Sequence, residues 1–135
     1  MGYVLDTSAL MRLLLDEPGA DQVQRIVEGD NPVALPFMTV MEIQYTLLRW
    51  LPRAQVEQIV ATLRARPVEI VESDLAWGGL AAQVKSRGGL SLADAWIVTL
   101  ALQQNFTLLH QGPESSDSVP DLRAQKMGST PEAGR

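Results

Sequence analysis

Short apolar segments alternate with longer amphipathic segments along this chain. The short segments show no strict polar–apolar alternation, which is typical of strands covered on both faces, and the longer ones have the apolar spacing of helices. The pattern predicts strands at 3–6, 31–36, 67–71 and 106–110, and helices at 7–17, 20–29, 39–50, 53–66, 73–87 and 91–104. Strands that alternate with helices form parallel sheets, so we predict an α/β fold whose parallel sheet is covered on both faces.

Prolines separate several of these segments, and the pattern ends after the last predicted strand. Pro18 precedes the second helix and Pro52 separates the third from the fourth, in keeping with the poor fit of proline to helix interiors. Residues 119–127 could add a short edge element, whereas the small and polar residues of 128–135 predict disorder. We therefore expect one domain over 1–127, followed by a disordered tail.

The composition is that of an ordinary globular domain, with 46% hydrophobic and 20% charged residues among 135. No cysteine is present, which excludes disulfides and thiolate metal ligands and suits a reducing cytoplasm. The mostly apolar run 95–102 is shorter than the roughly 20 residues of a membrane-spanning helix. Asp6 stands where a secretory signal would be basic. We expect a cytoplasmic protein with no membrane contact.

The net charge of −5 bears on the choice of partner. Proteins that hold nucleic acid through phosphate contacts alone are usually basic. An acidic chain that acts on nucleic acid would need metal ions to supply positive charge. The charge therefore argues weakly against nucleic acid, with a metal-dependent protein as the exception.

Asp94 is an acid within an otherwise apolar helix. Val98 and Ala101 stand one and two turns beyond it on the same face, and burial of an unpaired carboxylate costs several kcal/mol. Ser91 and Asp94 have the spacing of a capping box, so Ser91 is expected to support the start of this helix. A cap does not explain an acid above an apolar face, and Asp94 is therefore a candidate metal ligand.

Two more acids stand near predicted helix starts. Asp6 directly follows the first strand, where it would serve equally well as a helix N-cap or as a ligand at a strand end. Glu42 follows Thr39 with capping-box spacing and shares a polar stripe with Tyr45. Taken alone, Glu42 favours a structural role over a functional one.

Considered together, the three acids favour a functional role, because a parallel sheet brings helix starts of this kind to one edge. Helix N-termini favour ionised carboxylates, but clustered carboxylates repel one another and raise each other's pKa. A hard divalent cation resolves this conflict, and Mg²⁺ binds carboxylate oxygens while keeping several waters. We therefore predict that Asp6, Glu42 and Asp94 converge on a metal site at the carboxyl edge of the sheet.

Other catalytic motifs are absent from the sequence. It contains no G-x-x-x-x-G-K-[ST], no G-x-G-x-x-G after a strand, no G-x-S-x-G, and no D-x-D after the first strand. His110 is the only histidine, and a lone histidine at a strand end favours a structural role. Trp77 and Trp96 fall on apolar helices and are expected in the core, whereas Trp50 could lie at an interface.

The motifs VLDTSAL, TVMEI and GLSLADAWIVTLAL, followed by the strand FTLLH, resemble those of PIN-domain ribonucleases. The closest likeness is to the VapC type, the toxin half of bacterial toxin–antitoxin pairs, and it runs from about Tyr3 to about Glu114. The resemblance implies a three-layer α/β/α sandwich around a mainly parallel sheet. It also implies Mg²⁺ or Mn²⁺ as cofactor and single-stranded RNA as substrate.

The resemblance implies roles for individual residues as well. The family has acids at the positions that match Asp6, Glu42 and Asp94, with Thr7 or Ser8 supporting the first. Metal held by these carboxylates would activate a water for in-line attack on a phosphodiester and stabilise charge on the phosphate. Metal would also offset the acidic balance that argues against RNA.

One departure from the family concerns a fourth acid. Many relatives carry it after the last strand, in a T-L-V-T-x-D-P-like segment, where this chain reads TLLHQGPE with Gly112 at that position. Glu114 or Asp117 could substitute for it, or the acid is missing. The departure bears on the level of activity more than on the fold.

Partners also follow from the resemblance. It implies a cognate antitoxin that inserts a segment over the active site, and a homodimer. Apolar residues of the helices 39–50 and 53–66 could form the dimer contact, such as Leu47, Leu48, Trp50, Val56 and Ile59.

We therefore predict a metal-dependent endoribonuclease that is the toxin component of a toxin–antitoxin system. Two alternatives stay open. One is a PIN-like binding or assembly module that has lost catalysis, which Gly112 favours. The other is a small phosphoacceptor domain that uses Asp6 and Mg²⁺.

Overall fold

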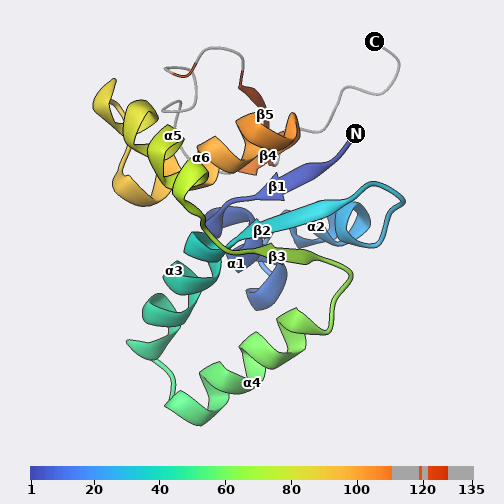
Figure 1. Ribbon diagram of the computed structural model, residues 1–135. Helices are drawn as coiled ribbons and strands as arrows, with labels where there is room; N and C mark the ends of the chain where they lie inside the picture. The colour runs from blue at the N-terminus through green and yellow to red at the C-terminus, as the bar shows by residue number, and fades with distance from the viewer. Residues whose placement is uncertain (111–118, 120–121, 128–135) are drawn as a thin grey trace.

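A five-stranded parallel sheet organises the part of the chain that the computed structural model describes, residues 1–110, 119 and 122–127. Its strands are β1 (Tyr3–Leu5), β2 (Val33–Pro36), β3 (Glu69–Val71), β4 (Thr107–His110) and β5 (Arg123–Lys126). They lie in the order β3-β2-β1-β4-β5, and every neighbouring pair is parallel. All carboxyl ends therefore lie at one edge of the sheet, as predicted (Figure 1).

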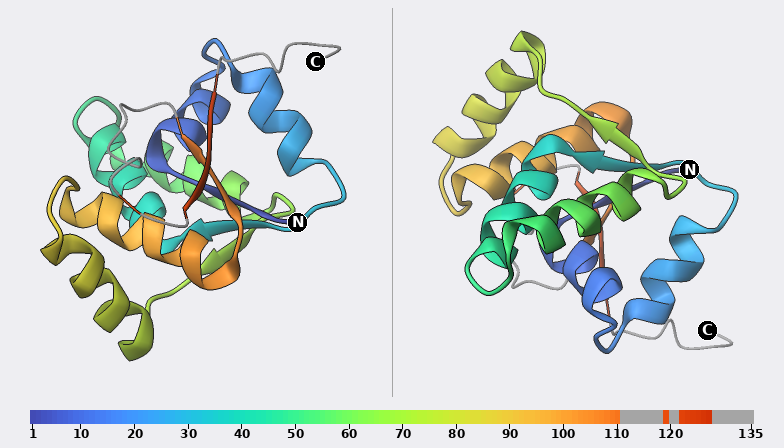
Figure 2. Two further views of the ribbon diagram at one scale, coloured as in Figure 1. Left: turned by 90° about the horizontal axis from the view of Figure 1, so that it is seen from above. Right: turned by 90° about the horizontal axis from the view of Figure 1, so that it is seen from below.

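The helices of the described residues cover both faces of this sheet (Figure 2). They are α1 (Thr7–Leu15), α2 (Ala20–Val27), α3 (Phe37–Leu48), α4 (Arg53–Arg64), α5 (Leu75–Ser86) and α6 (Leu92–Gln104). One core packs α1 to α4 against one face, and a second core packs α5 and α6 against the other. The fold is the expected three-layer α/β/α sandwich. None of these helices is long and apolar enough to cross a membrane.

Neighbouring residues of the central strands enter different cores. Val4 belongs to the core beneath α5 and α6, whereas Leu5 belongs to the core beneath α1 to α4. Leu108 and Leu109 of β4 divide in the same way. Successive side chains of a strand point to opposite faces, so a strand covered on both faces is apolar at every position. This is why the strand segments lack polar–apolar alternation.

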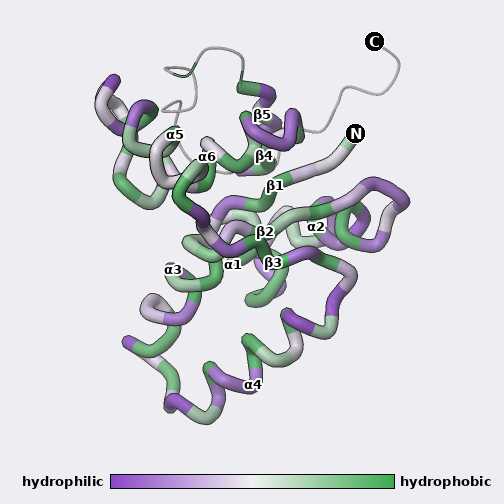
Figure 3. Tube along the Cα trace, viewed as in Figure 1, coloured by the Kyte–Doolittle hydropathy of each residue, from purple (hydrophilic) through white to green (hydrophobic). Residues whose placement is uncertain are grey.

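The covering helices are amphipathic, and Figure 3 shows hydrophobic and hydrophilic residues alternating along α4. Val56 and Leu63 of α4 are buried, whereas Arg53 and Glu57 are exposed and form a salt bridge (2.8 Å). An exposed pair of this kind contributes less than about 1 kcal/mol. Burial of the apolar face therefore holds α4 in the core beside α3.

Helix α3 begins at Phe37, ahead of the predicted start. Pro36 ends β2 and is also the N-cap residue of the helix. Thr39 therefore lies inside the helix, where it is buried and its hydroxyl donates to the Leu5 carbonyl oxygen at the end of β1 (3.1 Å). The capping box of Thr39 and Glu42 does not form, because this threonine hydroxyl joins α3 to β1.

The edge element expected within 119–127 is present as β5, the outer strand beside β4. The proposed tail 128–135 lies outside the described residues, as do Gly112, Glu114 and Asp117. Because β5 pairs with β4, β4 is an interior strand of the sheet, with a neighbour on each side.

The tryptophans divide between core and surface. Trp77 of α5 is buried, and its indole N–H donates to the Trp96 carbonyl oxygen of α6 (2.9 Å). Trp96 is half-buried and donates its indole N–H to the Ser73 hydroxyl (3.1 Å). Trp50, just beyond α3, is 70% exposed. The core prediction is confirmed for Trp77 and holds in part for Trp96, while the interface role of Trp50 stays a prediction.

Candidate active site

Asp6 stands at the carboxyl end of β1, where the strand passes directly into α1. It is the N-cap of that helix, since its Oδ1 accepts hydrogen bonds from the Ala9 backbone N–H (2.9 Å) and the Ser8 hydroxyl (2.7 Å). Its own backbone N–H donates to the Leu109 carbonyl oxygen (3.2 Å), which extends the pairing of β1 with β4. The two side-chain bonds use one carboxylate oxygen of two, so capping and ligand roles are compatible.

Burial raises the pKa of the Asp6 carboxyl above its ordinary value of 3.8, because moving a charged group out of water costs free energy. The hydrogen bonds from Ala9 and Ser8 lower this pKa, as does the nearby His110. The Asp94 carboxylate raises it. His110 and Asp94 are therefore close enough to Asp6 to act on its charge, and a cation beside the carboxylates would relieve their repulsion.

Glu42 joins this edge through Thr7, the first residue of α1. The Thr7 hydroxyl donates to Glu42 Oε1 (2.5 Å), and the Tyr45 hydroxyl donates to Oε2 (3.4 Å). Glu42 is half-buried and lies in the second turn of α3, because that helix begins earlier than predicted. The two hydroxyls singled out in the sequence thus hold different acids: Thr7 holds Glu42, and Ser8 holds Asp6.

Asp94 lies in the first turn of α6, whose N-cap is Ser91. The Ser91 hydroxyl accepts a hydrogen bond from the Asp94 backbone N–H (3.1 Å), as the spacing predicts. Asp94 is half-buried, whereas Ala95 and Val98 beside it are buried. The acid therefore lies at the rim of the apolar face and keeps contact with solvent, which limits the cost of its charge.

The structure links two pairs of neighbours at this edge, and these involve the predicted acids from three separate elements. Asp94 interacts electrostatically with Asp6, and Thr7, the next residue of the chain, holds Glu42. Within residues 1–110, 119 and 122–127, no three Asp, Glu or His side chains are arranged to hold a metal ion. The carboxylates of Asp6 and Glu42 are instead fixed by hydroxyl and backbone N–H donors. The three-ligand metal site stays a prediction.

His110 belongs to this edge as well, although its position in the sequence favours a structural role. It is the buried last residue of β4. The preceding residue, Leu109, pairs with Leu5 and accepts the Asp6 backbone N–H. His110 therefore neighbours Asp6 and acts on its charge. Only the strand order reveals this, since the two residues are far apart in the chain.

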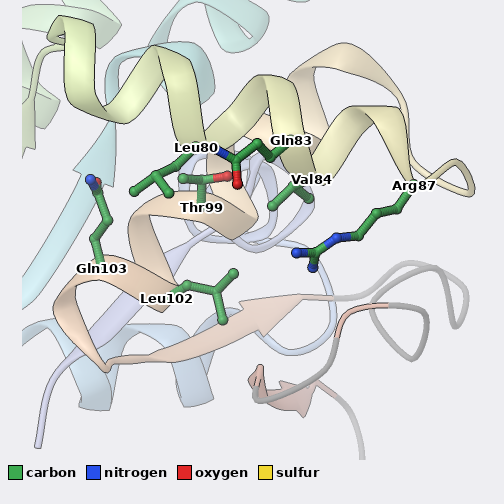
Figure 4. Close-up of a pocket in the computed structure, with 7 residues that line it drawn as sticks. All are labelled: Leu80, Gln83, Val84, Arg87, Thr99, Leu102 and Gln103. Carbon is green, nitrogen blue, oxygen red and sulfur yellow. The ribbon is translucent and has the colours of Figure 1, made fainter.

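A cavity of about 220 Å³ between α5 and α6 has no part in the acidic edge (Figure 4). It is lined by Leu80, Gln83, Val84, Arg87, Thr99, Leu102 and Gln103. None of these side chains is a carboxylate, and the Thr99 hydroxyl donates to the Ala95 carbonyl oxygen of its own helix (2.6 Å). The cavity lining therefore supplies no carboxylate for a hard cation.

Residues 3–117 match the family model of the PIN domain. The matched range contains every described element from β1 to β4, and with them Asp6, Glu42 and Asp94. The chain belongs to the PIN domain family. The resemblance seen in VLDTSAL and LSLADAWI is confirmed, and this PIN domain places the two motifs at the starts of α1 and α6.

Solved structures share the fold of this PIN domain. VapBC2 from Rickettsia felis, bound to a DNA fragment from its promoter, has a TM-score of 0.78 at 16% identity, covering 93% of this chain and 98% of that one. VapBC-1 from nontypeable Haemophilus influenzae has a TM-score of 0.72 at 22% identity, with the same coverage of 93% and 98%. VapC20 from Mycobacterium tuberculosis, a sarcin–ricin loop cleaving toxin, has a TM-score of 0.64 at 13% identity, covering 78% and 86%. No curated protein matches the chain in sequence.

Proposed function

We propose that this PIN domain is a metal-dependent endoribonuclease that hydrolyses RNA phosphodiester bonds and is the toxin of a toxin–antitoxin pair. The observation that carries the proposal is the interaction of Asp6 with Asp94 at the edge where Thr7 holds Glu42. Carboxylates with perturbed pKa values cluster at functional sites. The shared fold of VapC20, a sarcin–ricin loop cleaving toxin, supports RNA as the substrate.

The carboxylate oxygens at this edge are the kind of donor that a hard divalent cation such as Mg²⁺ or Mn²⁺ prefers. Asp6, Glu42 and Asp94 offer carboxylate oxygens, and Mg²⁺ is commonly bound through one or two carboxylates while it keeps several waters. The burial of Asp6 beside Asp94 also favours a positive charge between them. When bound, the ion supplies Lewis acidity and positive charge at the scissile phosphate.

Hydroxyl groups hold two of the acids before substrate arrives, and a third hydroxyl caps the helix that carries Asp94. The supports are Ser8 for Asp6, Thr7 for Glu42, and Ser91 for the helix that carries Asp94. Groups that are fixed in advance lose little entropy when the reaction begins, which lowers the barrier. The carboxylates can accept hydrogen bonds from the attacking water and align it with the scissile bond.

The proposed protein partner is a cognate antitoxin. Two of the solved structures that share this fold are VapBC assemblies, which supports a partner of that kind. An antitoxin segment inserted over the acidic edge would keep RNA away from Asp6 and Asp94.

We also propose a homodimer built around α3. Leu47 and Val56, which the sequence also suggested for this contact, are instead buried in the core. Met41, Tyr45 and Leu48 on this helix are 52%, 51% and 48% exposed, and Trp50 just beyond it is 70% exposed. The spacing of the three helical residues places them on one face. A row of exposed large apolar side chains is typical of an interaction surface.

Cleavage of bacterial RNA by the purified protein tests the proposed activity. Wild-type protein is expected to cleave only with Mg²⁺ or Mn²⁺, and Asp94→Asn is expected to lose activity about 100-fold or more. The matched control is Asp74→Asn, because Asp74 is the N-cap of α5 and accepts the Trp77 backbone N–H (2.8 Å). Asparagine caps helices about as well as aspartate, so this control should cleave like wild type.

Expression in a bacterial host without a partner tests the toxin assignment. Wild-type protein is expected to arrest growth, and Asp94→Asn is not. Cleavage that survives a chelator, or equal cleavage by wild type and Asp94→Asn, would contradict the proposal.

A second candidate function is a PIN domain that binds partners without catalysis. Gly112, at the position of the fourth acid in TLLHQGPE, favours it. Such a protein would leave RNA intact at every metal concentration, so the same cleavage assay separates the two functions.

A further inference from the structure

Strand β5 brings a lysine to the carboxyl edge of the sheet. In the ladder between β4 and β5, His110 pairs with Lys126, and in the ladder between β1 and β4, Leu5 pairs with Leu109. Asp6 continues β1 in an extended conformation, with its backbone N–H on the Leu109 carbonyl oxygen. Asp6, His110 and Lys126 therefore form one row across three neighbouring strands.

This row points to the face of the sheet that α6 covers. Val4 and Leu108 stand two residues before Asp6 and His110, and both pack in the core with α6. Side chains two residues apart in a strand share a face. Lys126 is in register with His110 and leaves the sheet on the same face, but it is exposed whereas His110 is buried.

The place of Lys126 suits an RNA phosphate. Neighbouring strands lie about 4.8 Å apart, so the Cα atom of Lys126 is about 10 Å from that of Asp6. A lysine ammonium on a flexible stem is a common ligand for phosphate. We propose that Lys126 binds a backbone phosphate beside the scissile one and so holds the RNA strand across the acidic edge. This proposal rests on the function proposed above.

The positive charge of Lys126 would also offset part of the negative charge at this edge. The net charge is −5, and the carboxylates at the edge repel every phosphate that approaches. A metal ion would offset this repulsion at the scissile phosphate. The next phosphate along the strand would still need a positive partner. Arg123, at the other end of β5, contacts Met1 Sδ (3.5 Å) at the amino edge of the sheet.

Binding of a labelled, single-stranded oligoribonucleotide of mixed sequence over a range of KCl concentrations tests the proposal. Asp94→Asn serves as the background, so that the probe stays intact. In this background, Lys126→Gln is expected to lower the slope of log Kd against log salt by about 0.7, the value for one contact on a single strand. At about 0.1 M salt, binding should be about fivefold weaker. Arg123→Gln removes the same charge from the opposite end of β5 and should bind like the background.

Cleavage by the otherwise wild-type protein gives a second measurement. Lys126→Gln is expected to raise KM about fivefold at unchanged kcat, and Lys126→Arg should restore KM. Thermal melts of the variants verify that they fold.

Two results would overturn the role of Lys126. One is RNA binding that Lys126→Gln leaves unchanged. The other is an equal loss of RNA affinity in Lys126→Gln and Arg123→Gln, because the loss would then reflect the net charge of the protein and not a contact at Lys126. RNA binding that depends on Lys126 in a protein that never cleaves would instead overturn the proposed function and support this contact.

Discussion

The carboxyl group of Asp6 caps a helix and at the same time lies near enough to Asp94 to feel its charge. As an N-cap, it accepts the Ala9 backbone N–H and stabilises the start of α1. Because it is half-buried and lies near Asp94, it is costly to ionise. Capping needs only an oxygen acceptor, whereas a metal ligand needs the negative charge. A substitution at this residue should therefore separate helix capping from the proposed metal binding.

Asp6→Asn is accordingly expected to be at least as stable as wild type at neutral pH in metal-free buffer. The pKa of Asp6 in the folded state lies above 3.8. Between 3.8 and that raised value, the folded state holds more protons than the unfolded state, so the free energy of unfolding falls as pH rises. As pH rises through this range, the stability of Asp6→Asn relative to wild type should increase, and above the raised pKa it should level off.

Urea unfolding at a series of pH values measures the effect. Asp74→Asn, at the exposed N-cap of α5, is the matched control for the chemical change. A lower stability of Asp6→Asn at every pH would contradict the prediction.

Thr7→Val is expected to impair cleavage more than stability. The substitution removes the hydroxyl that donates to Glu42 Oε1 (2.5 Å), which should lower the free energy of unfolding by about 1 kcal/mol. A carboxylate that is no longer held in place should lower kcat by about tenfold or more. Thr62→Val is the control, because the Thr62 hydroxyl donates to the Gln58 carbonyl oxygen on the exposed side of α4 (3.0 Å). Similar cleavage by both variants would show that Thr7 does not position Glu42.

Among the elements, the junction of α3 with β1 decides where Glu42 stands. The helix is joined to the strand by the buried hydroxyl of Thr39, which donates to the Leu5 carbonyl oxygen. Leu5 directly precedes Asp6, so the same bond sets α3 beside the first acid. The position of Glu42 thus depends on a contact between two elements as well as on the helix itself.

Thr39→Val keeps the volume of the side chain but removes this bond. We expect it to lower the free energy of unfolding by about 1–3 kcal/mol, because the buried carbonyl oxygen loses a donor. Thr99→Val is the matched control, since Thr99 is also buried but its hydroxyl bonds to Ala95 within α6. Chemical denaturation compares the two. An equal or larger loss of stability in Thr99→Val would mean that the hydrogen bond between α3 and β1 contributes no more than one within a helix.

For the whole molecule, the apolar row on α3 predicts self-association. Leu48→Glu is expected to convert a dimer to a monomer, because burial of an unpaired carboxylate at an interface is costly. Leu15→Glu on α1 is the control, since Leu15 is exposed to a similar extent, 43% against 48% for Leu48. Light scattering over a range of concentrations gives the masses. A monomer mass for wild-type protein at high concentration would count against the homodimer.

Most elements of this PIN domain are readable from its sequence, because local pattern encodes them. The run Tyr3–Leu5 is apolar throughout since β1 is covered on both faces, and Asp6 ends it because the polar cap of α1 follows at once. Ser91 likewise marks the start of α6 through a bond that spans three residues. Such features depend on residues close together in the chain, so their periodicity and capping chemistry can be recognised without a structure.

Tertiary structure alone decided how these elements are arranged into a site. The strand order places His110 beside Asp6 and Lys126 beside His110, and a contact with β1 engages Thr39 in place of a capping box. The Thr7 hydroxyl reaches Glu42 because α1 packs against α3. Each of these contacts joins residues that are distant in the chain. Local periodicity carries no information about such pairs, because they are selected by the packing of the two cores on a shared sheet.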